Sequence, residues 1–202
     1  MKEKIIKEST QLFFRHGIRS ITMDDIAKEI GISKKTLYLH FENKNELLLS
    51  CMEANECEEK NILSSFQNLA KNAIDEMIMV ASYVEQKLQK ISPTLIYDVQ
   101  KYHSSAWEQI HKMHYQEVYR VIQENLTKGI AEGLYRDDFN VDIVSKIYVQ
   151  TSVMGINSDF FAPCQYDLAE VIKTNIFYHI HGVVSEKGLA LLQSMKSKIN
   201  LK

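Results

Sequence analysis

The stretch from Thr22 to Phe41, TMDDIAKEIGISKKTLYLHF, constrains the fold more than any other part of the chain. Thr22 and Asp25 have the spacing of a capping box, which begins a helix. Gly31 favours the left-handed conformation that ends a helix, and Ser33 is suited to cap the next one. Two short helices joined by a tight turn containing glycine form a helix-turn-helix, whose second helix enters the major groove of DNA.

The first turn of the second helix is basic. Lys34 and Lys35 stand where free backbone N–H groups and the helix dipole already attract anions. Cations at that end are unfavourable for an isolated helix, so their placement indicates an anionic partner. Leu37 and Phe41 form a buried edge, which turns other side chains outward. A threonine such as Thr36 can meet a phosphate, a base edge or a thymine methyl group. An ordinary solvated helix face is the alternative interpretation.

The chain resembles the tetracycline-repressor (TetR) family of bacterial transcriptional regulators. The matching residues are Phe13, Gly17, Thr22, Ile26, Ala27, Gly31, Ser33, Thr36, Leu37, Tyr38, His40, Phe41, Lys44, Leu47 and Leu48. The resemblance implies an all-α fold, in which a three-helix helix-turn-helix DNA-binding domain precedes a helical ligand-binding and dimerisation domain, about nine to ten helices in all. It also implies a homodimer that binds a palindromic operator in double-stranded DNA and responds to a small-molecule inducer.

Within the resemblance, eight positions match those that contact DNA in the family: Thr22, Ser33, Lys34, Lys35, Thr36, Tyr38, His40 and Lys44. At Leu39 many relatives carry a polar or aromatic residue, so no polar base contact is expected there. We assign residues 1–48 to the DNA-binding domain and residues 49–202 to the ligand-binding and dimerisation domain.

Composition agrees with this assignment. Two prolines and seven glycines in 202 residues favour an all-helical protein. The net charge of −2 does not by itself indicate nucleic-acid binding, but residues 1–50 carry nine Lys and Arg against seven Asp and Glu. No signal peptide or long apolar run is visible, so we expect a cytoplasmic protein without a membrane partner. Cys51, Cys57 and Cys164 lack metal-type spacing and are expected to be buried or incidental, with a thiol sensor as the alternative.

The rest of the chain has the periodicity of long helices with short connections. We expect helices over about 2–16, 62–90, 92–102, 105–133, 140–161 and 167–182, a helix that opens near Asn43, and a last one from about 185. The helices over 140–161 and 167–182 are apolar on more than one face, which indicates a dimer interface. The alternative is that they are central core helices of a monomer. The expected interface residues are Ile147, Met154, Val171, Ile172, Ile176, Phe177 and Ile180.

A ligand cavity is expected between the connecting helices. Aromatic and polar side chains that could line it are Tyr83, Tyr97, Tyr102, Trp107, His111, Tyr115 and Phe160, although core packing is the default interpretation for each.

An enzyme is the competing class. Glu108 and His111 form one Glu-x-x-His pair with His114 close by, whereas a helical di-iron site needs two such motifs and two further glutamates. We therefore expect no metal, no cofactor and no catalytic site. A helical adaptor that binds protein instead of DNA is a third possibility.

Overall fold

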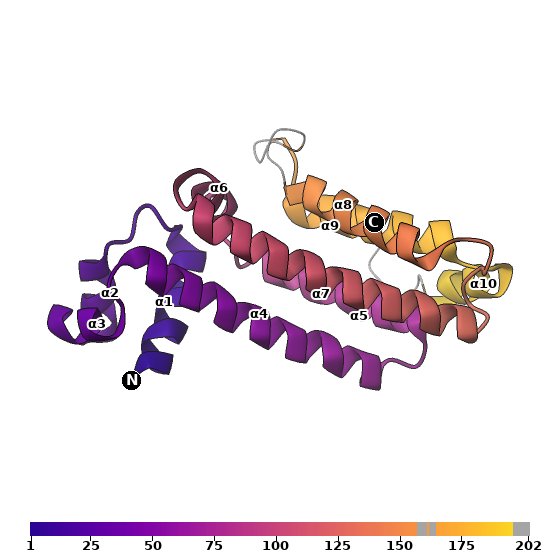
Figure 1. The fold of residues 1–202 in the computed structure, drawn as a ribbon. Coiled ribbons are helices and arrows are strands. Elements are labelled where there is room, and N and C mark those ends of the chain that lie inside the picture. Colours follow the sequence, from indigo (N-terminus) through magenta and orange to yellow (C-terminus); the bar gives the residue numbers. More distant parts are fainter. Residues whose placement is uncertain (157–160, 162–164, 196–202) are drawn as a thin grey trace. The chain divides into compact units, whose positions relative to one another are not determined.

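The computed structural model describes residues 1–156, 161 and 165–195. These residues form ten helices and no strand, so the all-α prediction is confirmed (Figure 1). The helices are α1 (Lys2–His16), α2 (Met23–Ile30), α3 (Lys34–His40), α4 (Lys44–Leu69), α5 (Ala73–Leu88), α6 (Pro93–Tyr102), α7 (Ser104–Ala131), α8 (Val141–Ile156), α9 (Leu168–Val183) and α10 (Glu186–Met195). None of the helices in the described ranges combines the length and hydropathy needed to span a membrane.

One predicted helix boundary is wrong. The expected single helix over 62–90 is divided, because α4 continues to Leu69 and α5 begins at Ala73. The Asn72 side chain accepts a hydrogen bond of 2.9 Å from the Asp75 backbone N–H, and the Asp75 carboxylate accepts one of 2.9 Å from the Lys71 backbone N–H. This reciprocal pattern resembles a capping box and starts a new helix inside a segment whose apolar periodicity is continuous.

The chain divides into two compact units. The first comprises Met1–Asn61 and Gln89–Tyr115, and the second comprises Ile62–Leu88 and Gln116–Lys202. Helices α4 and α7 contribute residues to both. The assignment of DNA binding to 1–48 and of ligand binding to 49–202 is a division by function, and it stays a prediction.

The core of the first unit joins the three N-terminal helices to α6 and the start of α7. Phe13, Ile26 and Leu37 are fully buried, and Leu95 and Val99 of α6 belong to the same cluster. The backbone also connects these segments, since the Ser92 N–H donates to the Phe14 carbonyl at 2.7 Å and the Arg19 N–H donates to the Asp98 carboxylate at 3.2 Å. Burial of these large side chains holds α2 and α3 in a fixed orientation.

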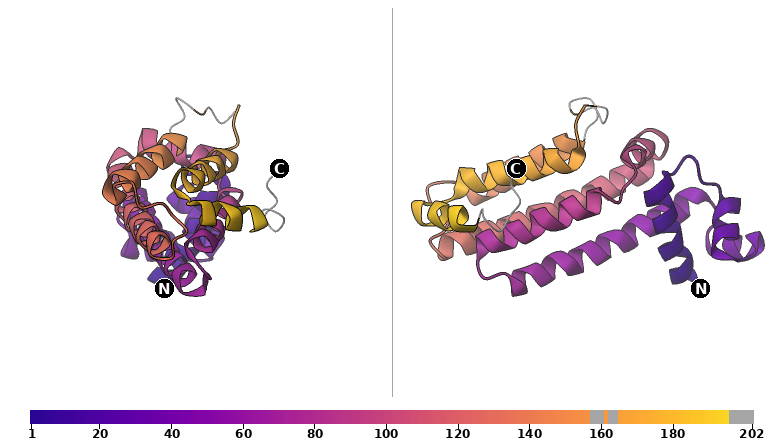
Figure 2. Two further views of the ribbon diagram at one scale, coloured as in Figure 1. Left: turned by 90° about the vertical axis from the view of Figure 1, so that its right-hand side faces the viewer. Right: turned by 180° about the vertical axis from the view of Figure 1, so that it is seen from behind.

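The core of the second unit lies among α5, α8 and α9. Helices α8 and α9 lie along one another in both views of Figure 2, and α9 packs against α5. Ile172, Ile176 and Ile180 form one buried stripe of α9 and belong to the same core as Ile74 and Met77 of α5. Burial in the chain's own core therefore accounts for these three of the seven residues that we expected at a dimer interface.

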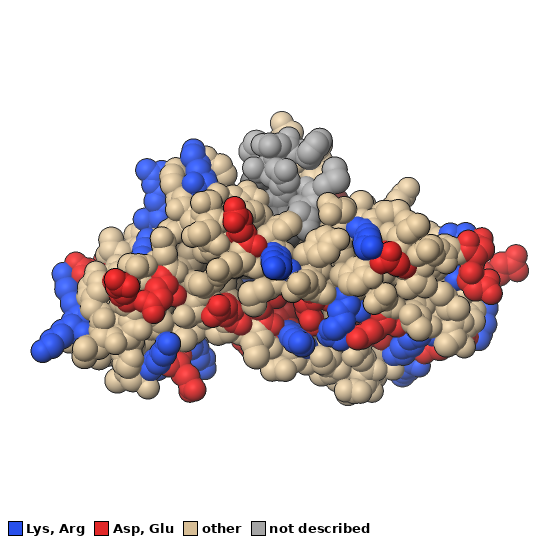
Figure 3. All heavy atoms as spheres, in the orientation of Figure 1, with Lys and Arg blue, Asp and Glu red and all other residues tan. Residues whose placement is uncertain are grey.

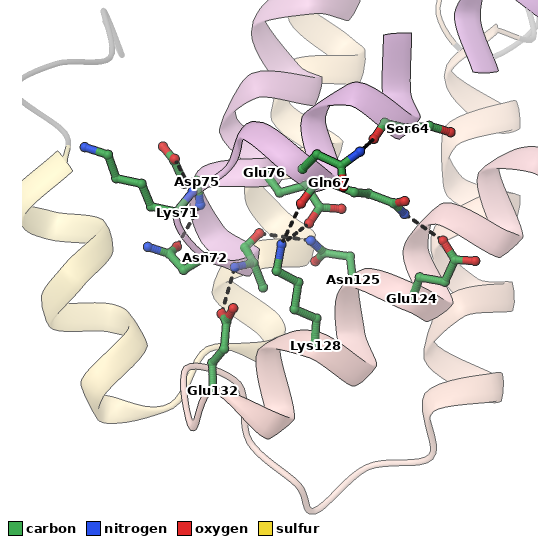
Figure 4. Close-up of polar contacts among 12 residues, drawn as sticks. Ser64, Gln67, Lys71, Asn72, Asp75, Glu76, Glu124, Asn125, Lys128 and Glu132 are labelled. Carbon is green, nitrogen blue, oxygen red and sulfur yellow. Dashed lines mark hydrogen bonds and ion pairs between the residues drawn. The ribbon is translucent and has the colours of Figure 1, made fainter. Parts of the chain in front are cut away.

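A buried polar network fixes α5 to α7 (Figure 4). Glu76 is almost fully buried and its carboxylate lies 2.9 Å from the Lys128 ammonium. The Asn125 side chain donates to the Ala73 carbonyl at 3.0 Å, and the Glu132 carboxylate accepts from the Ala73 N–H at 2.8 Å. These contacts satisfy polar groups at the start of α5, where backbone N–H groups have no partner within the helix.

Candidate nucleic-acid interface

The first helix of the helix-turn-helix is capped as the sequence predicted. The Asp25 N–H donates to the Thr22 hydroxyl oxygen at 3.2 Å, and the Thr22 N–H donates to the Asp25 carboxylate at 2.9 Å. Hydrogen bonds from the Thr22 side chain and backbone hold the pKa of Asp25 below its ordinary value. Gly31 ends α2 with φ 73° and ψ 37°, a conformation that costs glycine little.

The second helix is fixed at its start and on its inner face. The Thr36 N–H donates to the Ser33 hydroxyl oxygen at 3.0 Å, and the two hydroxyl oxygens lie 2.8 Å apart. Leu37 and Phe41 are buried in the core of the first unit. Because both ends of this short helix are anchored, the direction of its outer side chains is set by the fold and not by a flexible loop.

The outer face of α3 carries Lys35, Tyr38 and Leu39. Tyr38 is 49% exposed and Leu39 is 75% exposed, and Lys35 is exposed as well. Within the described part of the chain, Lys35 has no hydrogen bond or ion pair. His40 is half-buried at the last position of the helix. A cation, an aromatic ring and an aliphatic side chain are therefore presented together to solvent.

The remaining predicted DNA contacts already have intramolecular partners. Thr22 and Ser33 use their hydroxyl groups as helix caps. The Lys34 ammonium pairs with the carboxylate of Asp24, on the preceding helix. Sequence reasoning missed Asp24, because the pair spans the turn and depends on how α2 and α3 cross.

Lys44 differs most from the expectation of a phosphate contact. Its ammonium donates to the Ile18 carbonyl, which lies in the segment between α1 and α2. Burial lowers the pKa of Lys44, while the charges of Asp98 and Asp25 act in the opposite direction. The lysine therefore connects the start of α4 to the α1–α2 segment, and in this conformation it is only partly available to a phosphate.

Basic and acidic side chains are interspersed on the face drawn in Figure 3. This pattern agrees with the net charge of −2. On this face a polyanion would meet individual cations and not a broad basic surface.

The residues expected at a ligand site are distributed over the two units. Tyr83 packs edge-on against Phe66 in the second unit, with ring centroids 5.9 Å apart. In the first unit Trp107 and His111 are neighbours at 5.6 Å, and Tyr115 is half-buried. Tyr97 and Tyr102 are exposed and both contact the Lys101 ammonium through their rings. Phe160 lies outside the described residues, and a shared ligand pocket stays a prediction.

Neither the thiol sensor nor the Glu-x-x-His metal motif gains support from the placement of its residues. Cys51 is buried, and burial raises the pKa of its thiol to about 12, which disfavours the reactive thiolate. Cys57 is exposed, and Cys164 lies outside the described residues. Glu108 is exposed, whereas His114 faces Glu56 of α4.

Comparison with known proteins agrees with this geometry. Residues 5–51 match the family described as "Bacterial regulatory proteins, tetR family". The chain is 22% identical over 188 residues to the uncharacterized HTH-type transcriptional regulator YvaF of Bacillus subtilis, covering 93% of this chain and 97% of that protein. It is 42% identical over 53 residues to IcaR of Staphylococcus epidermidis, the negative transcriptional regulator of the biofilm operon icaADBC, covering 26% of this chain and 29% of IcaR.

A solved structure extends the comparison to the helical body. The transcriptional regulator FadR from Bacillus subtilis, in complex with stearoyl-CoA, has a TM-score of 0.67 and 16% identity, covering 90% of this chain and 99% of FadR. At this level of identity the likeness shows the fold. These relatives are transcriptional regulators and not enzymes. The match over residues 5–51 therefore identifies the helix-turn-helix as belonging to the tetR family of bacterial regulatory proteins, and the helical body beyond it has the fold seen in solved transcriptional regulators.

Proposed function

We propose that this regulator is a ligand-responsive homodimeric repressor that binds a palindromic operator through α3. The observation that carries the proposal is the outer face of α3, where Lys35 and Tyr38 are exposed on a helix anchored by Leu37 and Phe41. A short rigid helix with an exposed cation and aromatic ring suits the major groove, where side chains reach phosphates and base edges.

The eight proposed DNA residues divide into two roles. Lys35, Tyr38 and the half-buried His40 make direct contacts, and Leu39 adds an apolar contact. Thr22, Ser33, Thr36, Lys34 and Lys44 orient the two helices through the caps and pairs described above, and Lys34 exchanges Asp24 for a phosphate on binding. The DNA-binding function belongs to residues 1–48.

The dimer forms through the solvent side of α8 and α9. Ile143 and Ile147 lie one turn apart on α8 and are exposed, with Ile147 at 57%, and Tyr178 of α9 is 82% exposed. A surface depression lined by Thr151, Val171 and Tyr178 continues this side. Exposed aliphatic and aromatic side chains gathered on one side are typical of a protein interface.

The remaining interface candidates contribute less or fall outside the description. Phe177 and Val171 are half-buried and can contact a partner with their outer atoms. The side chain of Met154 lies outside the described part of α8. A two-fold interface between copies of the chain matches a palindromic site, with half-sites about 34 to 36 Å apart or a multiple of that distance.

Ligand response acts through α4. Residues 44–48 form the first part of α4, and this helix contributes residues to both compact units. A small molecule held by the candidate aromatic residues shifts the operator equilibrium only through its different affinity for the bound and released states. The stearoyl-CoA complex of FadR supports a small organic ligand, and the negative regulator IcaR supports repression.

Selection of binding sites from a random duplex pool tests the proposal. The purified protein is expected to enrich an inverted repeat, and the double variant Lys35→Ala, Tyr38→Ala is expected to lose the enrichment. Lys112→Ala, which removes an exposed lysine of α7, is the matched control and should enrich the same repeat. Enrichment retained in the double variant, or absent from wild type at low salt, would contradict DNA reading by α3.

A further inference from the structure

Three side chains that can ligate a metal meet in the first compact unit, away from α3. Glu56 and Glu59 lie three residues apart on α4, so they share one face of the helix. His114 reaches the same place from α7. One ligand atom of each residue lies within 4.8 Å of the other two. Two carboxylates and one imidazole from two helices therefore converge on a single point.

The electrostatic setting favours a cation. Glu59 is only 8% exposed, and the Glu56 side chain is 12% exposed. Little solvent reaches either carboxylate, so a cation bound between the two would interact strongly with both charges. Two carboxylates this close repel one another, and a divalent cation between them converts the repulsion into attraction.

The separation of the groups also fits a shared metal. The His114 Nδ1 atom and the Glu56 Oε1 atom are 3.6 Å apart, which is too long for a hydrogen bond. Nitrogen and oxygen ligands about 2.0 to 2.2 Å from one tetrahedral metal lie roughly 3.4 Å from each other. The observed distance is therefore close to that of two ligands on one ion, and small side-chain rotations close the site.

We propose that Glu56, Glu59 and His114 bind a divalent transition-metal cation of the zinc class, with water completing its coordination. One imidazole nitrogen and two carboxylate oxygens suit Zn²⁺ or Co²⁺, and the absence of sulfur from this ligand set disfavours Cu⁺. The bound ion ties α4 to α7 within the first unit. Binding requires a neutral imidazole, so it weakens in acid.

Direct metal titration tests the site without DNA, so its result is independent of the proposed repressor function. The full chain, free of purification tags and treated with a chelator, is titrated with Co²⁺ and followed by its visible absorption bands. One equivalent is expected to bind and to be displaced by Zn²⁺. His114→Gln and Glu56→Gln should each weaken Co²⁺ binding by about tenfold or more.

Two control variants separate the site from its neighbours. Glu58→Gln alters an exposed carboxylate of α4 outside the cluster, and Cys57→Ser removes the nearby exposed thiol. Both should bind Co²⁺ as wild type does. No Co²⁺ binding by wild type, or equal losses in Glu58→Gln and His114→Gln, would overturn the proposal. So would loss of binding in Cys57→Ser alone.

Thermal unfolding distinguishes loss of the metal site from failure of a variant to fold. Zn²⁺ that binds the native state raises the midpoint of wild type and of Glu58→Gln, but not that of His114→Gln. All variants should have the same helical circular dichroism in chelator. If His114→Gln is unfolded, Glu56→Gln supplies the same comparison. A Zn²⁺-dependent rise retained in the folded variants would overturn the site.

Discussion

Helices α3 and α9 both expose an aromatic side chain, but in different surroundings. Tyr38 on α3 stands beside Lys35 on a seven-residue helix. Tyr178 on α9 belongs to a unit whose solvent side also carries Ile143 and Ile147. A ring beside a cation suits a polyanion, whereas a ring accompanied by aliphatic side chains suits another protein surface. What surrounds an exposed tyrosine, more than its exposure, indicates the class of partner.

The two helices also differ in what holds them. Helix α3 depends on a cap and two buried side chains, so most of its surface is free. Helix α9 buries a complete stripe in its own unit and exposes only the opposite side. Substitutions in the two helices should therefore separate into effects on stability, on association and on DNA affinity.

The largest effect is expected inside α9. Ile176 is 1% exposed, and Ile176→Ala leaves a cavity that should lower the free energy of unfolding by about 2 to 5 kcal/mol. Ile147→Ala, on the exposed side of α8, should change it by less than about 0.5 kcal/mol. Urea denaturation at a protein concentration below that of dimer formation measures both. Equal losses of unfolding free energy in Ile176→Ala and Ile147→Ala would mean that Ile176 contributes no more to the core than the exposed Ile147 does.

Acid should destabilise the second unit through His179. Its ring lies 4.6 Å from that of Tyr148, and its Nε2 atom is buried without a partner among the described residues. Burial lowers the pKa of His179 from 6.5 to about 4. The unfolded chain therefore binds the proton first, so stability is complete above about pH 6.5 and falls toward pH 4, by about 3 kcal/mol at most.

The variant His179→Phe isolates this contribution. Its unfolding free energy should depend less on pH between 6.5 and 4 than that of wild type, whereas the carboxylates contribute equally to both proteins. Chemical denaturation at several pH values measures the difference. Parallel pH profiles would show that His179 is not buried in its neutral form.

A moderate effect is expected on DNA affinity from Tyr38. Tyr38→Ala removes a side chain from the outer face of α3 and should weaken operator binding by about 1 to 2 kcal/mol, roughly tenfold. Because Tyr38 is not part of the core, the thermal midpoint should stay within experimental error of wild type. Fluorescence anisotropy with the selected operator measures the affinity. A large fall in the midpoint would instead indicate a structural role.

The cap of α2 should have a smaller effect on stability. Thr22→Ala removes one hydroxyl from the capping box and should lower the free energy of unfolding by about 1 kcal/mol. Thr22→Ser, which keeps the hydroxyl, is the control and should restore most of the loss. Denaturant titration measures the two variants, and an unchanged Thr22→Ala would show that the cap contributes nothing.

The smallest expected effect is on the salt dependence of DNA affinity, which should differ between variants of two lysines of the first unit. Lys35→Ala should reduce the slope of log affinity against log salt by about one, because one phosphate contact is lost. Lys44→Ala should change that slope less, since its ammonium bonds to the Ile18 carbonyl. Anisotropy titrations over a range of salt concentrations compare them. A larger change in Lys44→Ala would reverse the assigned roles.

The sequence predicts features that depend on neighbouring residues, but not those that depend on tertiary contacts. The cap of α2 by Thr22, the αL glycine at 31 and the cap of α3 by Ser33 are local, and the structure has all of them. Two contacts depend on how the helices pack: Lys34 pairs with Asp24, and Lys44 donates to the Ile18 carbonyl. No local sequence pattern predicts either contact. The DNA-contacting residues themselves stay predictions.

The same limit applies to the helices that follow the helix-turn-helix. Periodicity showed that α9 is apolar on more than one side, but it could not tell which side faces the chain's own core. The approach of His114 to Glu56 and Glu59 joins residues from two helices, so no motif spacing within one helix indicates it. The start of α5 was missed because the apolar periodicity continues across Asn72, whose side chain caps the new helix.

Two matched tyrosine variants, Tyr38→Ala and Tyr178→Ala, test most directly whether α3 reads DNA and α9 forms the dimer. Each is measured by sedimentation for its oligomeric state and by anisotropy for operator affinity. We predict that Tyr38→Ala remains a dimer and loses operator affinity, whereas Tyr178→Ala weakens the dimer and binds DNA normally once its concentration restores the dimer. Wild-type operator affinity in Tyr38→Ala would contradict DNA reading by α3. A monomeric wild type that binds the operator fully would contradict the need for a dimer.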